Sequence, residues 1–373
     1  MPVITFEEAL AETTDMKRHL LLGNGFSIAL FPSCFTYGTL LDSVDFTPYP
    51  EIRWAFATLG TVDFEIVINA LRQTIALMPI YGGDASALAL MEQHAEALKE
   101  LLVQAIAGNH PERPNDITEE QYRSCRQFLA HFVGESRDRR AQGGDNLRAK
   151  LFSLNYDLLL YWTLLHNQIN VRDTSRPFGL VAEETEPLEH NDGFLPPEDD
   201  PDAEYVEWKG EEVDKQSVFY LHGALHLFDH GPELQKKCWE RSGGIALIEQ
   251  VHDALNKDKF PLYVSEGSSD GKLDRIMHSA YLHKGLRTLR KNCDSIGVSF
   301  FIFGHSLADN DMHILNQIRK GRFAKLYISI YGDPGDEANR QIIQRANGLA
   351  AMRSERYPLS IKFYDASSAH VWA

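Results

Sequence analysis

The sequence has few cysteines and no long apolar run. Its four cysteines (Cys34, Cys125, Cys238 and Cys293) stand singly and form no CxxC pair. This spacing argues against a disulfide framework and against a structural zinc ribbon. The longest apolar stretch, residues 158–165, is much shorter than the roughly 20 residues that a membrane-spanning helix needs. No secretory signal is visible at the N-terminus, so we expect a cytoplasmic protein without a membrane partner.

The sequence also lacks an excess of basic residues, and its negative charge is concentrated in one segment. The formal net charge is −16, and residues 182–214 contain 14 Asp and Glu against one Lys. The rest of the chain is therefore almost neutral. Because no basic face is available for a phosphate backbone, we expect no direct nucleic-acid binding. The long, polar, proline-containing stretch 172–214 is interpreted as a mobile lid or a partially disordered insertion.

Continuous apolar runs rich in β-branched and aromatic residues indicate strands that are covered on both faces. They lie at residues 19–22, 150–154, 218–221, 298–303, 325–330 and 360–364. Helical segments such as 309–320 alternate with them, which predicts βαβ units and a parallel sheet. We expect an α/β fold: a Rossmann-like parallel sheet with helices on both faces, formed by residues 1–50 and 145–373.

Residues 51–144 are predicted to form a helical insertion after the first βα unit. Apolar residues recur there at steps of three and four, as on one face of an amphipathic helix. They are Leu88, Met91, Ala95, Leu98, Leu102 and Ile106. Thr118-x-x-Gln121 predicts a capping box at the start of a further helix, with Tyr122, Cys125, Leu129 and Phe132 facing inward.

Four short motifs follow the apolar runs. They are Gly23-Asn24-Gly25-Phe26-Ser27, Asn155-Tyr156-Asp157, His222-Gly223 and Gly304-His305-Ser306-Leu307, the last continuing to Asp309 and Asp311. Loops at the carboxyl ends of parallel strands converge on one crevice, whatever their separation in sequence. The sequence therefore predicts that the four motifs form the walls of one nucleotide pocket.

The two glycine-containing motifs suit a phosphate or a ribose. Glycines allow backbone amides to approach an anion closely, and a following helix N-terminus favours it. The first motif is not GxGxxG, so an ordinary dehydrogenase is not indicated; a tight turn without a ligand is its alternative interpretation. Gly304, His305, Ser306 and Asp309 are candidates to bind the ligand, and Asp309 or Asp311 is predicted to cap the next helix. The strand ends at residues 329–333 and Asp365 are candidates for contact with adenosine.

The other two motifs suit catalysis. The Asn155 amide can hold ribose hydroxyls or a water, and Asp157 can accept hydrogen bonds from the same network. An Asx turn that caps the next helix explains this motif equally well. His222 suits a general base near neutral pH, although a lone histidine is more often structural. His226 and His230 continue a four-residue spacing, but the segment is predicted to be extended and no HExxH motif is present, so we expect no metal site.

Taken together, the motifs resemble those of the sirtuin-like family, the silent-information-regulator superfamily, in its bacterial branch of NAD hydrolases associated with anti-phage defence. Residues 23–27 are similar to its glycine-rich loop for the cofactor phosphates. Asn155 and Asp157 are similar to its Asn-x-Asp element, and His222 to its catalytic histidine. Residues 304–307 are similar to its Gly-Thr-Ser-like loop, with His305 in place of the Thr. The zinc ribbon of the deacylase members is missing, which argues against protein deacylation.

The resemblance implies that NAD⁺ is the substrate and that the bond between nicotinamide and ribose is cleaved through an oxocarbenium-like ribose. Asn155 would orient the ribose or the water, His222 would accept a proton, and Asp157 would support the network. We further expect control by assembly into a homo-oligomer or with a separately encoded partner such as an ATPase. The alternatives are a non-catalytic module that senses NAD or ADP-ribose, and an ADP-ribosyl transferase or deacylase.

Overall fold

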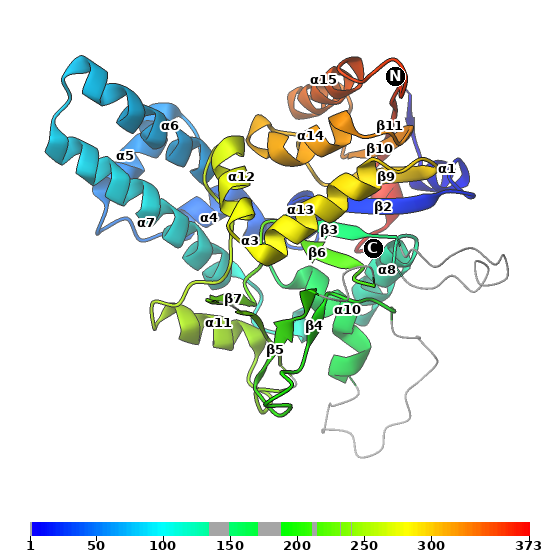
Figure 1. Cartoon of the computed structure of the whole chain (residues 1–373), viewed down its shortest axis with the longest axis horizontal. Coiled ribbons are helices and arrows are strands. Elements are labelled where there is room, and N and C mark those ends of the chain that lie inside the picture. The colour runs from blue at the N-terminus through cyan, green and yellow to red at the C-terminus, as the bar shows by residue number, and fades with distance from the viewer. Residues whose placement is uncertain (1, 134–148, 171–187, 211–214, 232, 240) are drawn as a thin grey trace.

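The computed structural model describes residues 2–133, 149–170, 188–210, 215–231, 233–239 and 241–373 (Figure 1). Its centre is a seven-stranded sheet with the order β1-β11-β10-β9-β2-β3-β6, in which every pair of neighbours is parallel. The strands are β1 (Val3–Ile4), β2 (Lys17–Leu22), β3 (Leu151–Ser153), β6 (Val218–Tyr220), β9 (Val298–Phe303), β10 (Lys325–Ile330) and β11 (Ser360–Asp365). The predicted α/β, Rossmann-like fold is confirmed, and each of the six predicted apolar runs is a strand. The short edge strand β1 was not predicted.

Helices cover both faces of this sheet, which explains why its strands are continuously apolar. On one face, Phe6 of α1 (Phe6–Ala11) and Phe128 of α8 (Glu119–Ala130) contact Phe301 and Phe303 of β9. On the other face, α13 (Ala280–Cys293) crosses in front of the sheet (Figure 1). There, a Cβ on Gly285 would lie 2.9 Å from the Leu221 side chain, so the glycine permits close packing. The remaining sheet helices are α10 (Leu159–Asn170), α14 (Met312–Lys320) and α15 (Glu337–Ala351).

The register of the central strands aligns their carboxyl ends. Leu22 pairs with Phe303 on one side and with Ser153 on the other, and Ser153 pairs with Tyr220. The residues that follow these four strands therefore leave the sheet at the same level. This level contains all four motifs.

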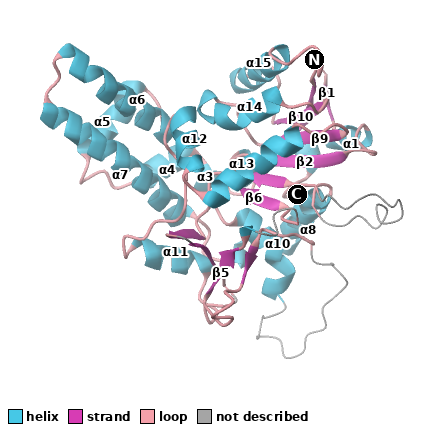
Figure 2. Ribbon diagram, viewed as in Figure 1, coloured by secondary structure: helices cyan, strands magenta, loops and turns pink. Residues whose placement is uncertain are grey.

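A helical insertion separates β2 from β3, as predicted. Its helices are α2 (Gly25–Ile28), α3 (Pro32–Phe35), α4 (Tyr37–Ser43), α5 (Pro50–Leu59), α6 (Phe64–Leu77), α7 (Ala85–Asn109) and α8, with 3-10 turns at Met78–Tyr81 and Pro114–Asp116. Residues 50–109, called the helical arm here, project away from the sheet (Figure 2). The insertion begins earlier than residue 51, because α3 and α4 belong to it, and its predicted end at residue 144 lies outside the described residues.

The sequence patterns inside the insertion are confirmed. In α7, Ala95, Leu98, Leu102 and Ile106 are buried, whereas Leu88 and Met91 are half-buried. The Thr118 hydroxyl accepts a hydrogen bond from the Gln121 amide at 3.2 Å, and the Gln121 side chain accepts one from the Thr118 amide at 2.9 Å. Tyr122, Cys125, Leu129 and Phe132 are buried as predicted.

The prediction that no helix spans a membrane is relevant to the helical arm. Among the described residues, no single helix has both the length and the apolar character to cross a membrane, while Pro50–Leu59 and Phe64–Tyr81 would meet that requirement only jointly, as a pair bent by 98°.

A second, antiparallel sheet was not predicted. Its order is β4-β5-β8-β7, with β4 (Phe194–Leu195), β5 (Tyr205–Trp208), β7 (Leu227–His230) and β8 (Glu233–Lys237). Residues 188–210 of the acidic stretch contain β4 and β5 and are therefore not a disordered insertion; residues 172–187 and 211–214 lie outside the described residues. The rings of Phe194 and Trp208 pack on Tyr281 of α13, and Asp192 pairs with Lys236, which fixes this part of the stretch.

Candidate functional site

One cavity of about 760 Å³ opens at the carboxyl ends of β2, β3, β6 and β9. All four motifs contribute to its walls, through Gly23, Asn24, Gly25, Asn155, Asp157, His222, Gly304, His305 and Ser306. The prediction that these motifs form one pocket is confirmed. Phe26, Ser27 and Asp309 were predicted to contact the ligand, but they are not among the lining residues.

The two glycine-containing loops pack directly against each other. The Gly25 amide donates to the Gly304 carbonyl at 2.8 Å, and the Gly23 amide donates to the Phe303 carbonyl at 2.9 Å. A Cβ on Gly25 would lie 2.6 Å from the Gly304 Cα, and Gly304 has a φ of +68°. The glycines are therefore required by the contact between the loops. Because both amides already have carbonyl partners, they do not offer the phosphate contacts that the sequence suggested.

Phe26 and Ser27 are buried and are hydrogen-bonded to residues that line the cavity. The Phe26 ring is fully buried, and its carbonyl accepts a hydrogen bond from the Trp372 indole at 2.8 Å. The Ser27 hydroxyl donates to an Asp157 carboxylate oxygen at 2.5 Å and accepts from the Asn155 side-chain amide at 3.1 Å. Ser27 thus joins the first motif to the second.

Asp157 combines a structural role with a place in the cavity wall. Its second oxygen accepts from the Leu159 amide at 2.9 Å, which is the Asx turn that the sequence left open. Burial raises the pKa of this carboxyl. Asp157 therefore orients Ser27, and through Ser27 it orients Asn155.

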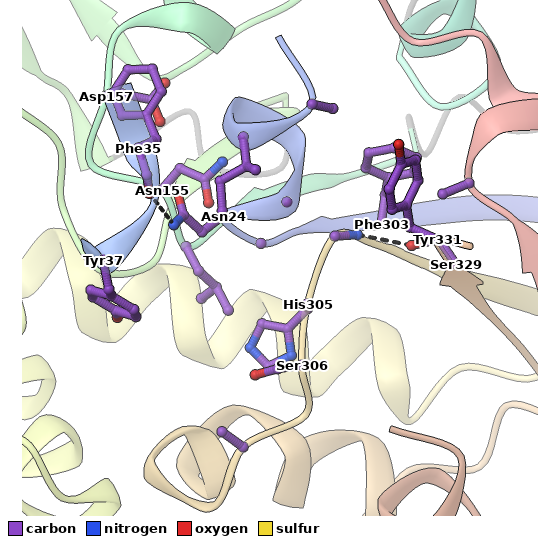
Figure 3. A pocket seen from close by; sticks show the side chains of 18 of the residues that line it. Asn24, Phe35, Tyr37, Asn155, Asp157, Phe303, His305, Ser306, Ser329 and Tyr331 are labelled. Carbon is purple, nitrogen blue, oxygen red and sulfur yellow. Dashed lines mark hydrogen bonds between the residues drawn. The ribbon is translucent and has the colours of Figure 1, made fainter. Parts of the chain in front are cut away.

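The Asn155 side chain has one free acceptor. The single hydrogen of the Ser27 hydroxyl points to Asp157, so Ser27 must accept from the Asn155 NH₂ group and the Asn155 Oδ1 points elsewhere. This oxygen is buried and has no hydrogen-bond partner among the described residues. An unpaired buried acceptor is costly, which makes Asn155 Oδ1 a candidate ligand contact (Figure 3).

His222 is a buried, neutral imidazole. Its Nε2 lies 3.0 Å from the His313 Nε2 and 3.8 Å from an Asp311 carboxylate oxygen. Burial first, and the Lys272 ammonium second, hold its pKa well below the usual range. The adjacent Gly223 has a φ of +82°, and a Cβ there would lie 1.9 Å from the Leu262 carbonyl. This glycine makes room for the backbone of residue 262.

A network of buried charges forms another part of the cavity wall. The Lys272 ammonium donates to Glu65 at 2.8 Å and to Asp311 at 2.9 Å, and the His305 Nε2 donates to the other Asp311 oxygen at 3.0 Å. Sequence reasoning missed Glu65 and Lys272, because charged residues in helical segments are usually solvated. Asp311 occupies the N-cap position of α14, as predicted, but its side chain makes no capping hydrogen bond and binds Lys272 and His305 instead. Asp309 is exposed and caps neither α14 nor the 3-10 turn before it.

The family model described as a domain of unknown function, DUF4917, matches residues 20–372. The chain belongs to the DUF4917 family. Comparison with curated proteins found no match. The matched range includes all four motifs, the helical arm and both sheets except β1 and the first three residues of β2. Glu65, Lys272 and Asp311 therefore all lie inside the DUF4917 domain.

Three side chains of the DUF4917 domain have the spacing of metal ligands. Atoms of His222, Asp311 and His313 lie within 4.8 Å of one another. However, the Lys272 ammonium lies 2.9 Å from Asp311, so a divalent cation bound there would face a fixed positive charge at short range. The group fits a proton-sharing polar cluster better than a cation site. His226 and His230 do not join this group; β7 begins between them, at Leu227.

The outer part of the DUF4917 cavity is lined by the ends of β10 and β11. The Ser329 hydroxyl accepts a hydrogen bond from the Gly304 amide at 2.9 Å, and Tyr331 lies beside it (Figure 3). Tyr331 lines the cavity while 79% of its surface is exposed. Of the predicted residues 329–333, Ser329 and Tyr331 therefore lie in the cavity wall. Asp365 is not among the lining residues, although its neighbours Ala366 and Ser367 are.

Proposed function

We propose that this protein is an NAD⁺ hydrolase that cleaves the bond between nicotinamide and ribose and releases nicotinamide and ADP-ribose. The observation that carries the proposal is that the free Asn155 Oδ1 and the neutral His222 line the same cavity. The volume of about 760 Å³ falls within the range of small-molecule sites, about 300–1,000 Å³.

The reaction requires little acid catalysis. Nicotinamide leaves as a neutral base, so the enzyme has to stabilise an oxocarbenium-like ribose and supply a water. Asn155 Oδ1 accepts a hydrogen bond from a ribose hydroxyl or from this water. His222, being neutral, is able to accept the proton that the water loses. Asp157 acts through Ser27 by holding the Asn155 amide in place.

The resemblance to sirtuin-like NAD hydrolases supports a role in anti-phage defence, in which the enzyme depletes cellular NAD. An enzyme of this kind has to be restrained until it is triggered. Restraint through a homo-oligomer or a separately encoded partner such as an ATPase belongs to the same proposal. Sedimentation of the protein alone and with candidate partners tests it, and a constitutively active monomer contradicts it.

A second function is favoured by one observation. The His222 Nε2 is already shared with His313 at 3.0 Å, and the ring is buried. An imidazole so enclosed is a weak base, which fits a module that binds NAD or ADP-ribose without cleaving it.

Nicotinamide release from NAD⁺ separates the two functions. We expect release by the wild type and a loss of roughly 10²–10⁴-fold in Asn155→Ala and His222→Ala, as for removal of a positioned acid–base group. His226→Gln is the matched control, because His226 is also buried but does not line the cavity. Thermal stabilisation by NAD⁺ without release of nicotinamide identifies the binding module. Full activity in both variants refutes the assignment of the site.

A further inference from the structure

One buried ammonium joins three segments that are far apart in the sequence. Lys272 lies on α12 (Ser269–Met277), Glu65 on α6 of the helical arm, and Asp311 at the end of the 3-10 turn Asp309–Asp311. Lys272 is 1% exposed and Glu65 is 4% exposed. All three side chains line the cavity, so the helical arm supplies part of the cavity wall.

The helical arm and α12 are in close contact. The Asn310 side-chain amide donates to the same Glu65 oxygen that accepts from Lys272. Gly267, just before α12, has a φ of +76°, and a Cβ there would lie 2.6 Å from the Glu65 carbonyl. Because its ammonium donates to both carboxylates, Lys272 sets the distance between Glu65 and Asp311. Without Lys272 the two carboxylates would be buried charges without compensation.

The same ammonium determines how Asp311 faces the imidazoles. One Asp311 oxygen accepts from Lys272, which leaves the other to accept from the His305 Nε2. The His305 Nδ1 accepts from the Leu307 amide at 2.9 Å, so His305 is held in the tautomer with its hydrogen on Nε2. The oxygen bound to Lys272 is also the one that lies 3.8 Å from the His222 Nε2.

We propose that Lys272 is a positioning residue for His305 and His222. Glu65 anchors Lys272, so the helical arm contributes to the geometry of the site. The effect on catalysis rests on the proposed NAD⁺ hydrolysis. The effect on the two imidazoles does not depend on that reaction.

The sign of the expected change follows from the groups around His222. Among the described residues, the charged and titratable groups near it are Lys272 from α12, Asp311 and His313 from the adjoining 3-10 turn and α14, His305 from the loop after β9, and Tyr156 from the loop after β3, whose ring stacks on His222. Burial is the main reason for its low pKa, and Lys272 is the second. Lys272→Met removes a positive charge and frees Asp311, so the pKa of His222 rises, while burial still holds it below the usual range.

The experiment measures the histidine side chains directly. Nitrogen-15 imidazole NMR across a pH series, with signals assigned by His305→Gln and His222→Gln, is recorded for the wild type, Lys272→Met and Glu65→Gln. The matched control is Lys236→Met, because Lys236 is a buried lysine paired with Asp192 that does not line the cavity. Nicotinamide release over the same pH range is measured in parallel.

In Lys272→Met we expect the His305 signals to shift, because the ammonium no longer holds the Asp311 carboxylate that accepts from His305, while the Leu307 amide keeps the tautomer. We also expect His222 to titrate at higher pH and nicotinamide release to fall roughly 10²-fold, as for a misplaced catalytic group. Glu65→Gln should shift the same signals less, since its carbonyl still accepts from Lys272, and Lys236→Met should shift neither. Unchanged His305 and His222 signals in Lys272→Met overturn the proposal. If that variant does not fold, unchanged signals in Glu65→Gln overturn it. A wild type that releases no nicotinamide refutes the proposed function, and the NMR result still decides the role of Lys272.

Discussion

The two walls of the cavity obtain their shape by different means. The wall formed by Gly23, Gly25 and Gly304 is backbone packed on backbone, with amides bound to carbonyls. The wall formed by Glu65, Lys272 and Asp311 is held by buried charges. The glycines of the first wall carry no titratable group, so pH does not act directly on the hydrogen bonds between their loops. The second depends on which of its groups carry a proton, and therefore it is the wall that pH or a bound charge is able to alter.

The largest effect on stability is expected from disrupting the wall formed by Gly23, Gly25 and Gly304. Gly304→Ala places a Cβ at a φ of +68° and 2.6 Å from the Phe26 amide nitrogen, so the loops have to separate. We expect a loss of roughly 3 kcal/mol in the free energy of unfolding, which urea denaturation measures. Gly108→Ala is the control, because nothing lies within 4 Å of its Cβ position in α7; it should stabilise by up to about 1 kcal/mol. Equal effects in the two variants would mean that the loop contact is not required.

A smaller, pH-dependent effect is expected at the charged wall. Burial, despite the opposing attraction of Lys272, raises the pKa of Glu65 from 4.5 to about 7. The protonated form is therefore favoured by folding: its contribution is complete below pH 4.5 and is lost as the pH rises through about 7. Glu65→Gln removes this dependence, so the wild type should lose stability relative to the variant over that range. Parallel stability curves for the two proteins between pH 4.5 and pH 7 would contradict this assignment.

The smallest effect on stability is expected at the mouth of the cavity. Tyr331 is 79% exposed, and Tyr331→Ala should change the free energy of unfolding by less than about 0.5 kcal/mol. If its ring stacks on the adenine, ADP-ribose binding measured by calorimetry should weaken roughly tenfold, at the lower end of base–aromatic stacking energies. Met352→Ala is the control, since Met352 is 53% exposed and does not line the cavity. Unchanged affinity in Tyr331→Ala would remove this residue from the site.

The predictable parts of the fold are the strands in which consecutive residues are apolar, because both faces of these strands are buried. The run Val298–Phe303 is a strand with the predicted bounds, because all six side chains are covered. Strand β1 has two residues, too few for any pattern. In β5 the sequence Tyr205–Trp208 contains a buried glutamate and lies in the acidic stretch, so its pairing with β8 has no local signal.

The same distinction holds for the site. Asn155 and His222 each come two residues after the last residue of a strand, β3 and β6, and strand topology alone brings them to one edge. Lys272 and Glu65 are separated by 207 positions, and their partnership depends on how α6 packs on α12. Nothing in either local sequence reveals it. The position of Asp311 at the N-cap of α14 was predictable, because a carboxylate is common there. Its side chain binds Lys272 instead of the helix amides, and this ammonium comes close only in three dimensions.

The location of Glu65 on α6 also has a thermodynamic consequence. If filling the cavity stabilises the pairing of Glu65 with Lys272, then it must equally favour the conformation of α6 in which that pairing exists. Linkage makes this coupling reciprocal. A molecule that binds α6 and shifts it changes the affinity of the cavity for its ligand by some factor. The ligand in the cavity then changes the affinity of α6 for that molecule by the same factor.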